Sequence, residues 1–149
     1  TMEVLEEQLN DAKIRGTLDR AEGLPSVEGD ADRIQQVLLN LLLNAIQATP
    51  EGGKIRVETN LQVRRRPGLE MTPEQSYVCV EVIDNGSGIA KKHLDEVFEP
   101  FFTTKGEIGG TGLGLAVCTG IVKEHDGWLE LDSAEGTGTT VRFFLPALI

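Results

Sequence analysis

Cysteine and histidine are scarce in this chain of 149 residues, which contains two of each. Cys79 and Cys118 stand in apolar stretches, so we predict that both are reduced core thiols and neither form a disulfide nor bind a metal. With so few thiols and imidazoles, a zinc site is not expected. Long hydrophobic runs are also missing, since none approaches the roughly 18 residues that a membrane-spanning helix needs.

Positive charge is in deficit, because 14 Lys and Arg stand against 24 Asp and Glu and leave a formal net charge of −10. Such a surface repels nucleic acids and anionic membranes, so we expect neither as a partner. Any phosphate ligand would need local donors. The acidic N-terminus is no signal peptide, and we expect a cytoplasmic domain. Thr1 precedes Met2, which suggests a piece excised from a longer protein.

Apolar periodicity along the chain predicts both helices and strands. The predicted helices are residues 2–14, 30–49, 91–99 and 113–125, and the predicted strands are 17–21, 54–63, 77–83, 128–131 and 139–145. Neither a repeat nor a linker interrupts them, so residues 1–149 are expected to form one domain. Strands joined mostly by hairpins, with helices segregated to one face, predict an α+β two-layer sandwich.

The helix predicted at 30–49 carries one polar stripe on an otherwise apolar surface. At about 100° per residue, five side chains share that stripe: Arg33, Gln36, Asn40, Asn44 and Gln47. A helix that is apolar nearly all round is expected to be buried, with its amides buried or lining a pocket. Amide oxygens suit Mg²⁺ held together with phosphates. Two core Asn satisfied by backbone groups are the alternative, and the helix alone does not decide.

Asp84 ends the strand predicted at 77–83 and begins the motif Asp84-Asn-Gly86-Ser-Gly88. A carboxylate at the end of a buried strand needs a donor, and an exocyclic amine such as adenine N6 would serve. Gly86 and Gly88 would let the backbone approach a flat ring closely. The alternative is an Asx-type turn after a strand.

A second glycine-rich segment, Gly109 to Gly114, leads into the helix predicted at 113–125. Such a turn presents free N–H groups and the positive end of a helix dipole to phosphate. It lacks both the Lys of a P-loop and the preceding strand of a dinucleotide fold, and a flexible loop is the alternative. Residues 97–105 hold three of the five Phe, which predicts either a hinged lid with Lys105 reaching for phosphate or a surface loop pinned by aromatics.

In this order, the motifs resemble the ATP-binding domain of sensor histidine kinases. That family shares a superfamily with DNA gyrase-type topoisomerases, mismatch-repair ATPases and a heat-shock chaperone. The resemblance covers roughly residues 30 to 146. It is tightest at Asn40-Leu-Leu-Leu-Asn44-Ala45, Asp84-Asn-Gly-Ser-Gly88-Ile89, Phe98-Glu-Pro-Phe-Phe-Thr-Thr-Lys105 and Gly110-Thr-Gly-Leu-Gly-Leu115, and the last two are most like the nitrogen-regulation branch.

The resemblance implies a Bergerat-type ATP-binding fold, a two-layer α/β sandwich in which three helices back a mixed sheet of about five strands. It implies ATP and Mg²⁺ as cofactors. Asn44 and Asn40 would hold Mg²⁺, and Asp84 would bind adenine N6 with Thr139 beside it through a water. Gly86 and Gly88 would border the base. The implied lid over the phosphates consists of Thr104, Lys105, Gly110, Thr111, Gly112, Leu113 and Gly114.

The implied activity is that of a protein-histidine kinase, which passes the γ-phosphate of ATP to a histidine. His93 and His125 lack the His-Glu pattern of an acceptor helix, so we predict that neither is catalytic. The acceptor would lie on the protein's own phosphoacceptor and dimerisation domain, connected through a helix within residues 1–15. A response regulator would be the downstream partner. We expect this fragment to be monomeric and the parent protein to be a homodimer.

Two positions depart from patterns of the superfamily. Asn40 stands where hydrolytic members carry a Glu that activates water, and a carboxamide is no base near neutral pH, which favours phosphoryl transfer over hydrolysis. Gln47 replaces a Lys of many histidine kinases and leaves Lys105 as the leading basic contact. The alternatives are an autonomous ATPase or an anti-sigma serine kinase of the same superfamily, and a nicotinamide-binding domain, which the missing parallel βαβ pattern disfavours.

Overall fold

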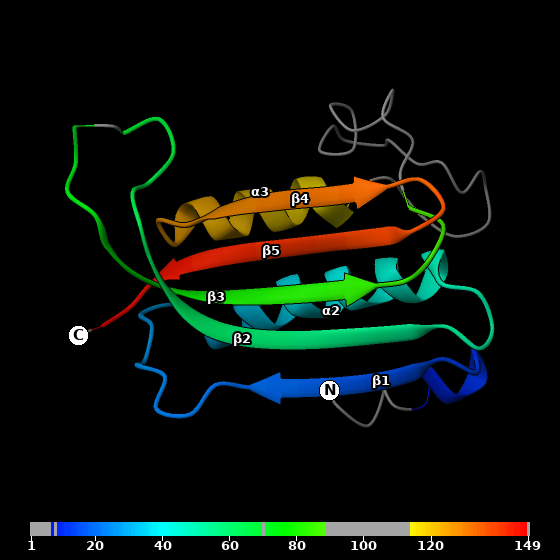
Figure 1. The fold of residues 1–149 in the computed structure, drawn as a ribbon. Coiled ribbons are helices and arrows are strands. Elements are labelled where there is room, and N and C mark those ends of the chain that lie inside the picture. Colours follow the sequence, from blue (N-terminus) through cyan, green and yellow to red (C-terminus); the bar gives the residue numbers. More distant parts are fainter. Residues whose placement is uncertain (1–6, 8, 70, 89–113, 149) are drawn as a thin grey trace.

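A computed structural model describes residues 7, 9–69, 71–88 and 114–148 (Figure 1). The strands are β1 (Arg15–Arg20), β2 (Lys54–Arg64), β3 (Gln75–Asp84), β4 (Trp128–Ala134) and β5 (Gly138–Pro146), and the helices are α2 (Ala31–Ala48) and α3 (Gly114–Glu124). Residues 9–11 are also helical, within the predicted N-terminal helix. The helix predicted at 91–99 lies outside the described residues. No helix in the described part of the chain is long and apolar enough to cross a lipid bilayer.

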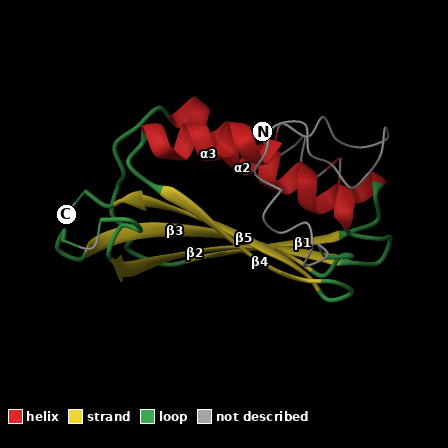
Figure 2. Cartoon of the chain, turned by 90° about the horizontal axis from the view of Figure 1, so that it is seen from above, coloured by secondary structure: helices red, strands yellow, loops and turns green. Residues whose placement is uncertain are grey.

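The strands form one mixed sheet in the order β1-β2-β3-β5-β4. β2 with β3, β3 with β5 and β4 with β5 are antiparallel, whereas β1 and β2 are parallel. Parallel neighbours cannot be joined by a tight turn, and α2 supplies the crossover between them. Figure 2 shows α2 and α3 together on one face of the sheet. The predicted α+β two-layer sandwich with a mixed five-stranded sheet is confirmed.

Local capping explains why α2 begins and ends where the sequence predicts. Asp30 is the N-cap, and its side chain accepts hydrogen bonds from the backbone N–H groups of Asp32 (3.0 Å) and Arg33 (3.4 Å). These bonds satisfy two donors that have no partner within the helix. At the other end Thr49 is the C-cap, and its hydroxyl donates to the Ala45 carbonyl at 2.7 Å.

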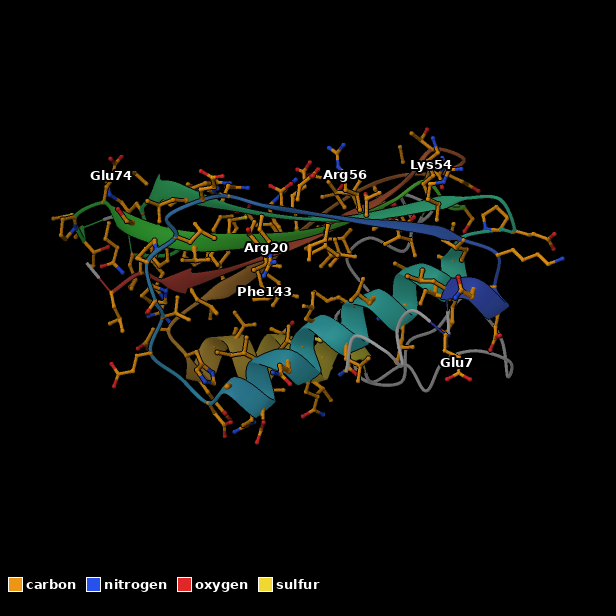
Figure 3. The ribbon with its side chains drawn as sticks, turned by 90° about the horizontal axis from the view of Figure 1, so that it is seen from below. Glu7, Arg20, Lys54, Arg56, Glu74 and Phe143 are labelled. Atoms are coloured by element: carbon orange, nitrogen blue, oxygen red, sulfur yellow. The ribbon has the colours of Figure 1, made fainter. Side chains whose placement is uncertain are left out.

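The main core lies between the sheet and the two helices. Figure 3 shows Phe143 on the helix side of the sheet and Arg56 on the opposite side. The core includes Val37, Leu41, Ile55, Val82, Cys118, Ile121, Val122 and Phe143. Cys79 and Cys118 are free cysteines in this structure, and both are buried, which confirms that they are core residues.

Two expectations about burial are wrong. Helix α2 is not buried nearly all round, because it packs against the sheet and α3 and leaves its remaining side at the surface. Its buried residues are Val37, Leu41, Leu42 and Ala45, while Arg33, Gln36 and Gln47 are exposed and Asn40 and Asn44 are half-buried. In β2, the predicted buried face ends early, since Leu61 is 46% and Val63 is 62% exposed. From their residue counts β2 is about 36 Å long and α2 about 27 Å, so the strand extends beyond the end of the helix above it.

A second, smaller cluster is buried on the sheet face away from the helices. It consists of Tyr77, Cys79, Trp128 and Phe144, and the rings of Trp128 and Phe144 stack with their centroids 4.5 Å apart. The guanidinium carbon of Arg64 lies 4.9 Å from the Phe144 centroid, and an Arg64 nitrogen lies 2.7 Å from Glu130. Arg64, the last residue of β2, belongs to this cluster, because a guanidinium stacks on aromatic faces while still pairing with a carboxylate.

Three segments meet backbone to backbone where β3 ends: the last turn of α2, residues 85–88, and the turn between β4 and β5. The N–H of Ser87 donates to the Ala48 carbonyl at 3.1 Å, and the N–H of Gly136 donates to the Ser87 carbonyl at 2.7 Å. A Cβ at Gly86 would lie 2.3 Å from the Ala48 oxygen, and one at Gly88 would lie 2.1 Å from the Ala134 oxygen. Both positions need glycine because neighbouring backbone occupies the space of a side chain.

This packing predicts that Gly86→Ala destabilises the domain, since the added methyl group meets backbone that cannot rotate away. We expect the free energy of unfolding to fall by about 1–3 kcal/mol, the usual cost of overpacking. Urea unfolding followed through Trp128, the single tryptophan, measures it. Gly120→Ala is the matched control: it lies in α3 with open space around it and should gain about 0.5–1 kcal/mol. Equal stability of Gly86→Ala and the parent would contradict the packing argument.

Candidate functional site

Helices α2 and α3 run antiparallel, and two contacts at one end of the pair fix this orientation. Arg33 near the start of α2 pairs with Glu124 at the end of α3, at 2.6 Å. The N–H of Asp30 donates to His125 Nε2 at 3.0 Å, and His125 Nδ1 lies 2.8 Å from the Ile121 carbonyl. Because a carbonyl only accepts, Nδ1 is the donor in this contact and Nε2 is the acceptor from Asp30. Both ring nitrogens of His125 therefore hold the helix ends together.

It follows that the N-terminus of α3 lies beside the C-terminal half of α2. Figure 1 shows this arrangement: the C-terminal end of α2, the arrowhead of β3 and the first turn of α3 lie at the same end of the molecule. α3 begins at Gly114, as the glycine-rich motif predicts. The positive end of the α3 dipole thus faces the same end of the fold as Asp84.

Asp84 is buried at the end of β3, with 8% of its surface exposed. Its Oδ1 accepts hydrogen bonds from the N–H of Gly86 at 2.9 Å and from the N–H of Thr139 at 3.3 Å. The contact with Gly86, two residues on, is the Asx-type turn weighed as the alternative for this motif. The same carboxylate also anchors β5, so the turn does not account for all that Asp84 does.

Thr139 lies directly opposite Asp84 in the pairing of β3 with β5 and is 9% exposed. Its hydroxyl oxygen is 2.8 Å from that of Ser133, which donates to the Gly138 carbonyl at 3.1 Å. Because the Ser133 hydroxyl donates its proton to the Gly138 carbonyl, the Thr139 hydroxyl donates to the Ser133 oxygen. The Thr139 oxygen can then still accept a hydrogen bond. Sequence reasoning missed Ser133. The pairing of Ser133 with Thr139 across the β4–β5 turn was the signal available.

Asn40 and Asn44 lie one turn apart on α2, and both are half-buried. Asn44 lies one turn before Ala48, whose carbonyl accepts a hydrogen bond from the N–H of Ser87. Asn44 therefore lies at the end of the fold that carries Asp84. Asn40 lies deeper along the pair, one turn after Val37, whose carbonyl oxygen lies 3.7 Å from the Cys118 sulfur of α3. The two amides occupy the boundary between core and surface, where their oxygens can reach a ligand.

The structure therefore places six of the predicted site residues at one end of the fold, with Asn40 one turn deeper along α2 than Asn44; the six are Asn44, Asp84, Gly86, Gly88, Gly114 and Thr139. Gly86 and Gly88 meet protein backbone, which is a reason for glycine that the sequence did not reveal. Their contact with a base stays a prediction. The remaining predicted residues lie outside the described part of the chain: Thr104, Lys105, Gly110, Thr111, Gly112 and Leu113.

Comparison with known proteins identifies the family of this chain. The family described as "Histidine kinase-, DNA gyrase B-, and HSP90-like ATPase" matches residues 29–149. The sensor kinase CckA of Brucella abortus is 45% identical over 136 residues, covering 89% of this chain and 14% of that protein. The sensory histidine kinase/phosphatase NtrB of Rhodobacter capsulatus is 44% identical over 132 residues, covering 86% of this chain and 36% of that protein. The chain thus spans well under half the length of these curated relatives.

Solved structures show the same fold. The catalytic domain of the histidine kinase ThkA superimposes with a TM-score of 0.76 at 32% identity, covering 97% of this chain and 86% of that domain. ThkA in complex with the response regulator protein TrrA matches with a TM-score of 0.73 at 30% identity, covering 97% of this chain and 37% of that one. From its fold, its site and the match over residues 29–149, the chain belongs to the histidine kinase-, DNA gyrase B- and HSP90-like ATPase family, and its similar relatives are sensor histidine kinases.

Proposed function

We propose that this chain binds ATP with Mg²⁺ and donates the γ-phosphate to a histidine on a separate phosphoacceptor domain of a two-component sensor kinase. The observation that carries the proposal is the convergence at one end of the fold. A buried carboxylate, Asp84, lies there with the half-buried amide of Asn44 and the N-terminus of α3, and the half-buried amide of Asn40 follows one turn deeper along α2. These groups suit the three parts of Mg-ATP: base, metal and phosphates.

Asp84 is the residue that selects adenine in this proposal. A carboxylate held by two backbone donors is a rigid acceptor, and an adenine N6 amine supplies a further donor to it. Thr139, with its hydroxyl oriented by Ser133, would hold a water beside the base. Gly86 and Gly88 would border the ring.

The amide oxygens of Asn44 and Asn40 would hold Mg²⁺, a hard cation that takes oxygen ligands. When bound, Mg²⁺ neutralises charge on the triphosphate and orients it for transfer. The N-terminus of α3 would stabilise the phosphates, with Thr104, Lys105 and the segment from Gly110 to Gly114 as the lid. Local donors of this kind are needed because the chain as a whole carries a net charge of −10.

Transfer to a protein acceptor is preferred over hydrolysis because Asn40 cannot act as a general base. The acceptor histidine would belong to a dimerisation domain linked through residues 1–15, so that the domain at 1–149 is a monomeric part of a homodimeric, cytoplasmically acting kinase. The complex of ThkA with TrrA supports a response regulator as the downstream partner. An autonomous ATPase or an anti-sigma serine kinase of the same superfamily is the alternative.

Asp84→Asn should weaken ATP binding and leave the fold intact, since the amide keeps an oxygen for Gly86 and Thr139 but presents a donor where adenine N6 already donates. Losing one charge-assisted hydrogen bond should cost roughly 1.5–3 kcal/mol, measurable by calorimetry. Asp19→Asn in the exposed strand β1 removes the same charge away from the site and should bind as the parent does. The parent should bind GTP poorly, and GTP competing as well as ATP would rule out the adenine assignment.

The phosphotransfer itself is tested with γ-labelled ATP. The chain alone should bind ATP yet neither label itself nor release phosphate appreciably. Mixed with a separate dimeric domain that carries a His-Glu acceptor helix, it should label that histidine, where the neighbouring carboxylate supplies the base that this chain lacks.

Acid treatment identifies the product, because a phosphohistidine is acid-labile. Asn44→Ala is the control and should abolish labelling of the acceptor domain while the protein stays folded. Acid-stable label on this chain would support the serine-kinase alternative, and phosphate release without an acceptor would support the ATPase.

A further inference from the structure

Three side chains from three neighbouring strands form one row across the sheet. Asp84 of β3 lies directly opposite Thr139 of β5, and Thr139 lies directly opposite Ser133 of β4. Directly opposite residues of antiparallel strands point to the same face of a sheet. Phe143 lies on the helix side in Figure 3, and Thr139 shares its face of β5, so the row faces the helices. Ser133 thus adjoins the two side chains that the proposed function assigns to the base.

The hydrogen bonds of Ser133 determine whether Thr139 donates or accepts toward a ligand. A hydroxyl group has one proton to donate, and a carbonyl oxygen can only accept. Ser133 Oγ lies 3.1 Å from the Gly138 carbonyl and 2.8 Å from Thr139 Oγ1, so its own proton goes to the carbonyl and the Thr139 proton goes to Ser133. The Thr139 hydroxyl then faces a ligand with lone pairs alone. Without the Ser133 oxygen, the same hydroxyl can rotate and donate outward.

The neighbouring carboxylate also accepts and does not donate. Asp84 Oδ1 already accepts from the N–H groups of Gly86 and Thr139, and an ionised carboxylate has acceptor oxygens only. A water that bridges Asp84 and Thr139 donates one proton to each, which leaves it only lone pairs for a base. Directly or through that water, these two side chains, here called the base corner, present acceptors alone. Adenine carries a donating amine at position 6, whereas guanine carries an accepting carbonyl there.

We propose that Ser133 is a positioning residue that sets the nucleotide specificity of the site: it takes up the proton of Thr139, so that the base corner accepts an amine and offers no donor to a carbonyl. This inference rests on the proposed function, because it takes Asp84 and Thr139 as the side chains that recognise the base. It assigns Ser133 no contact with nucleotide. Part of the preference for ATP then comes from rejecting GTP, whose carbonyl is left without a partner.

Ser133→Ala tests this role, because it removes the acceptor of the Thr139 proton and lets Thr139 turn that proton toward the guanine carbonyl. We expect GTP to bind about three- to tenfold more tightly than it binds the parent, the fold-change for gaining one ordinary hydrogen bond. The affinity for ATP should change less, and ATP should stay preferred because Asp84 is unchanged. Competition of ATP and GTP against a fluorescent ATP analogue, with Mg²⁺ present, measures the ratio of the two affinities.

Two further variants separate this role from a structural one. Ser133→Thr keeps an oxygen that accepts from Thr139, and it should keep the parental ratio. Ser76→Ala is the matched control, because it makes the same change at another half-buried strand position, at the opposite end of β3 from Asp84. It should leave both affinities unchanged. Loosening of the fold would weaken both nucleotides together, so a parental ratio in Ser133→Ala, or equal weakening of ATP and GTP, would overturn the inference.

A double-mutant cycle with Thr139→Val shows whether Ser133 acts through Thr139. Valine has no proton to turn toward the base, so adding Ser133→Ala should leave the ratio unchanged, whereas a further gain in GTP affinity contradicts the inference. The two levels of failure are distinguishable. A parent chain that prefers ATP, with no change of preference in Ser133→Ala, rejects the role of Ser133 alone. A parent chain that binds GTP as well as ATP rejects the adenine assignment and this inference with it.

Discussion

A carboxylate buried at the end of β3 constrains much of this fold. Moving a charged group out of water costs several kcal/mol unless donors replace the lost hydration. For Asp84 those donors include the backbone N–H groups of Gly86 and Thr139, one from the following loop and one from the neighbouring strand. To bring both within reach, the loop and the β4–β5 turn must approach each other closely. A Cβ at Gly138, whose φ is +137°, would lie 2.1 Å from the Asp84 carbonyl oxygen, so glycine is required there as well.

The antiparallel helix pair supplies the second constraint. The contacts of Arg33 with Glu124 and of Asp30 with His125 hold the far end of the pair. They fix which end of α3 faces the site, and that end carries the positive half of the helix dipole. In a chain with a net charge of −10, an anion cannot be attracted by the surface as a whole. A helix N-terminus and side-chain amides at one edge of the fold can bind an anion locally, despite the negative charge of the chain as a whole.

Prediction from the sequence worked best where the determinants are local. The ends of α2 were predictable because Asp30 caps the helix through its own neighbours, and Pro50 follows its end. The angular position of Asn40 and Asn44 was predictable because a helix repeats every 3.6 residues. Their burial was not, since it depends on what the sheet and α3 cover. The contacts of Arg64 could not be predicted for the same reason: its aromatic partners Trp128 and Phe144 come from strands far along the chain.

The sequence by itself determined the order of the motifs, and hence the family, together with the element types and the turns between them. Backbone hydrogen bonding and side-chain periodicity depend on residues a few positions away, so they can be read along one chain. Only the tertiary structure decided that Gly86 and Gly88 are packed against Ala48 and Ala134, and that Arg64 lies over the ring of Phe144. Those contacts join elements whose strand register and helix packing are set by the whole core at once, and no local pattern encodes them.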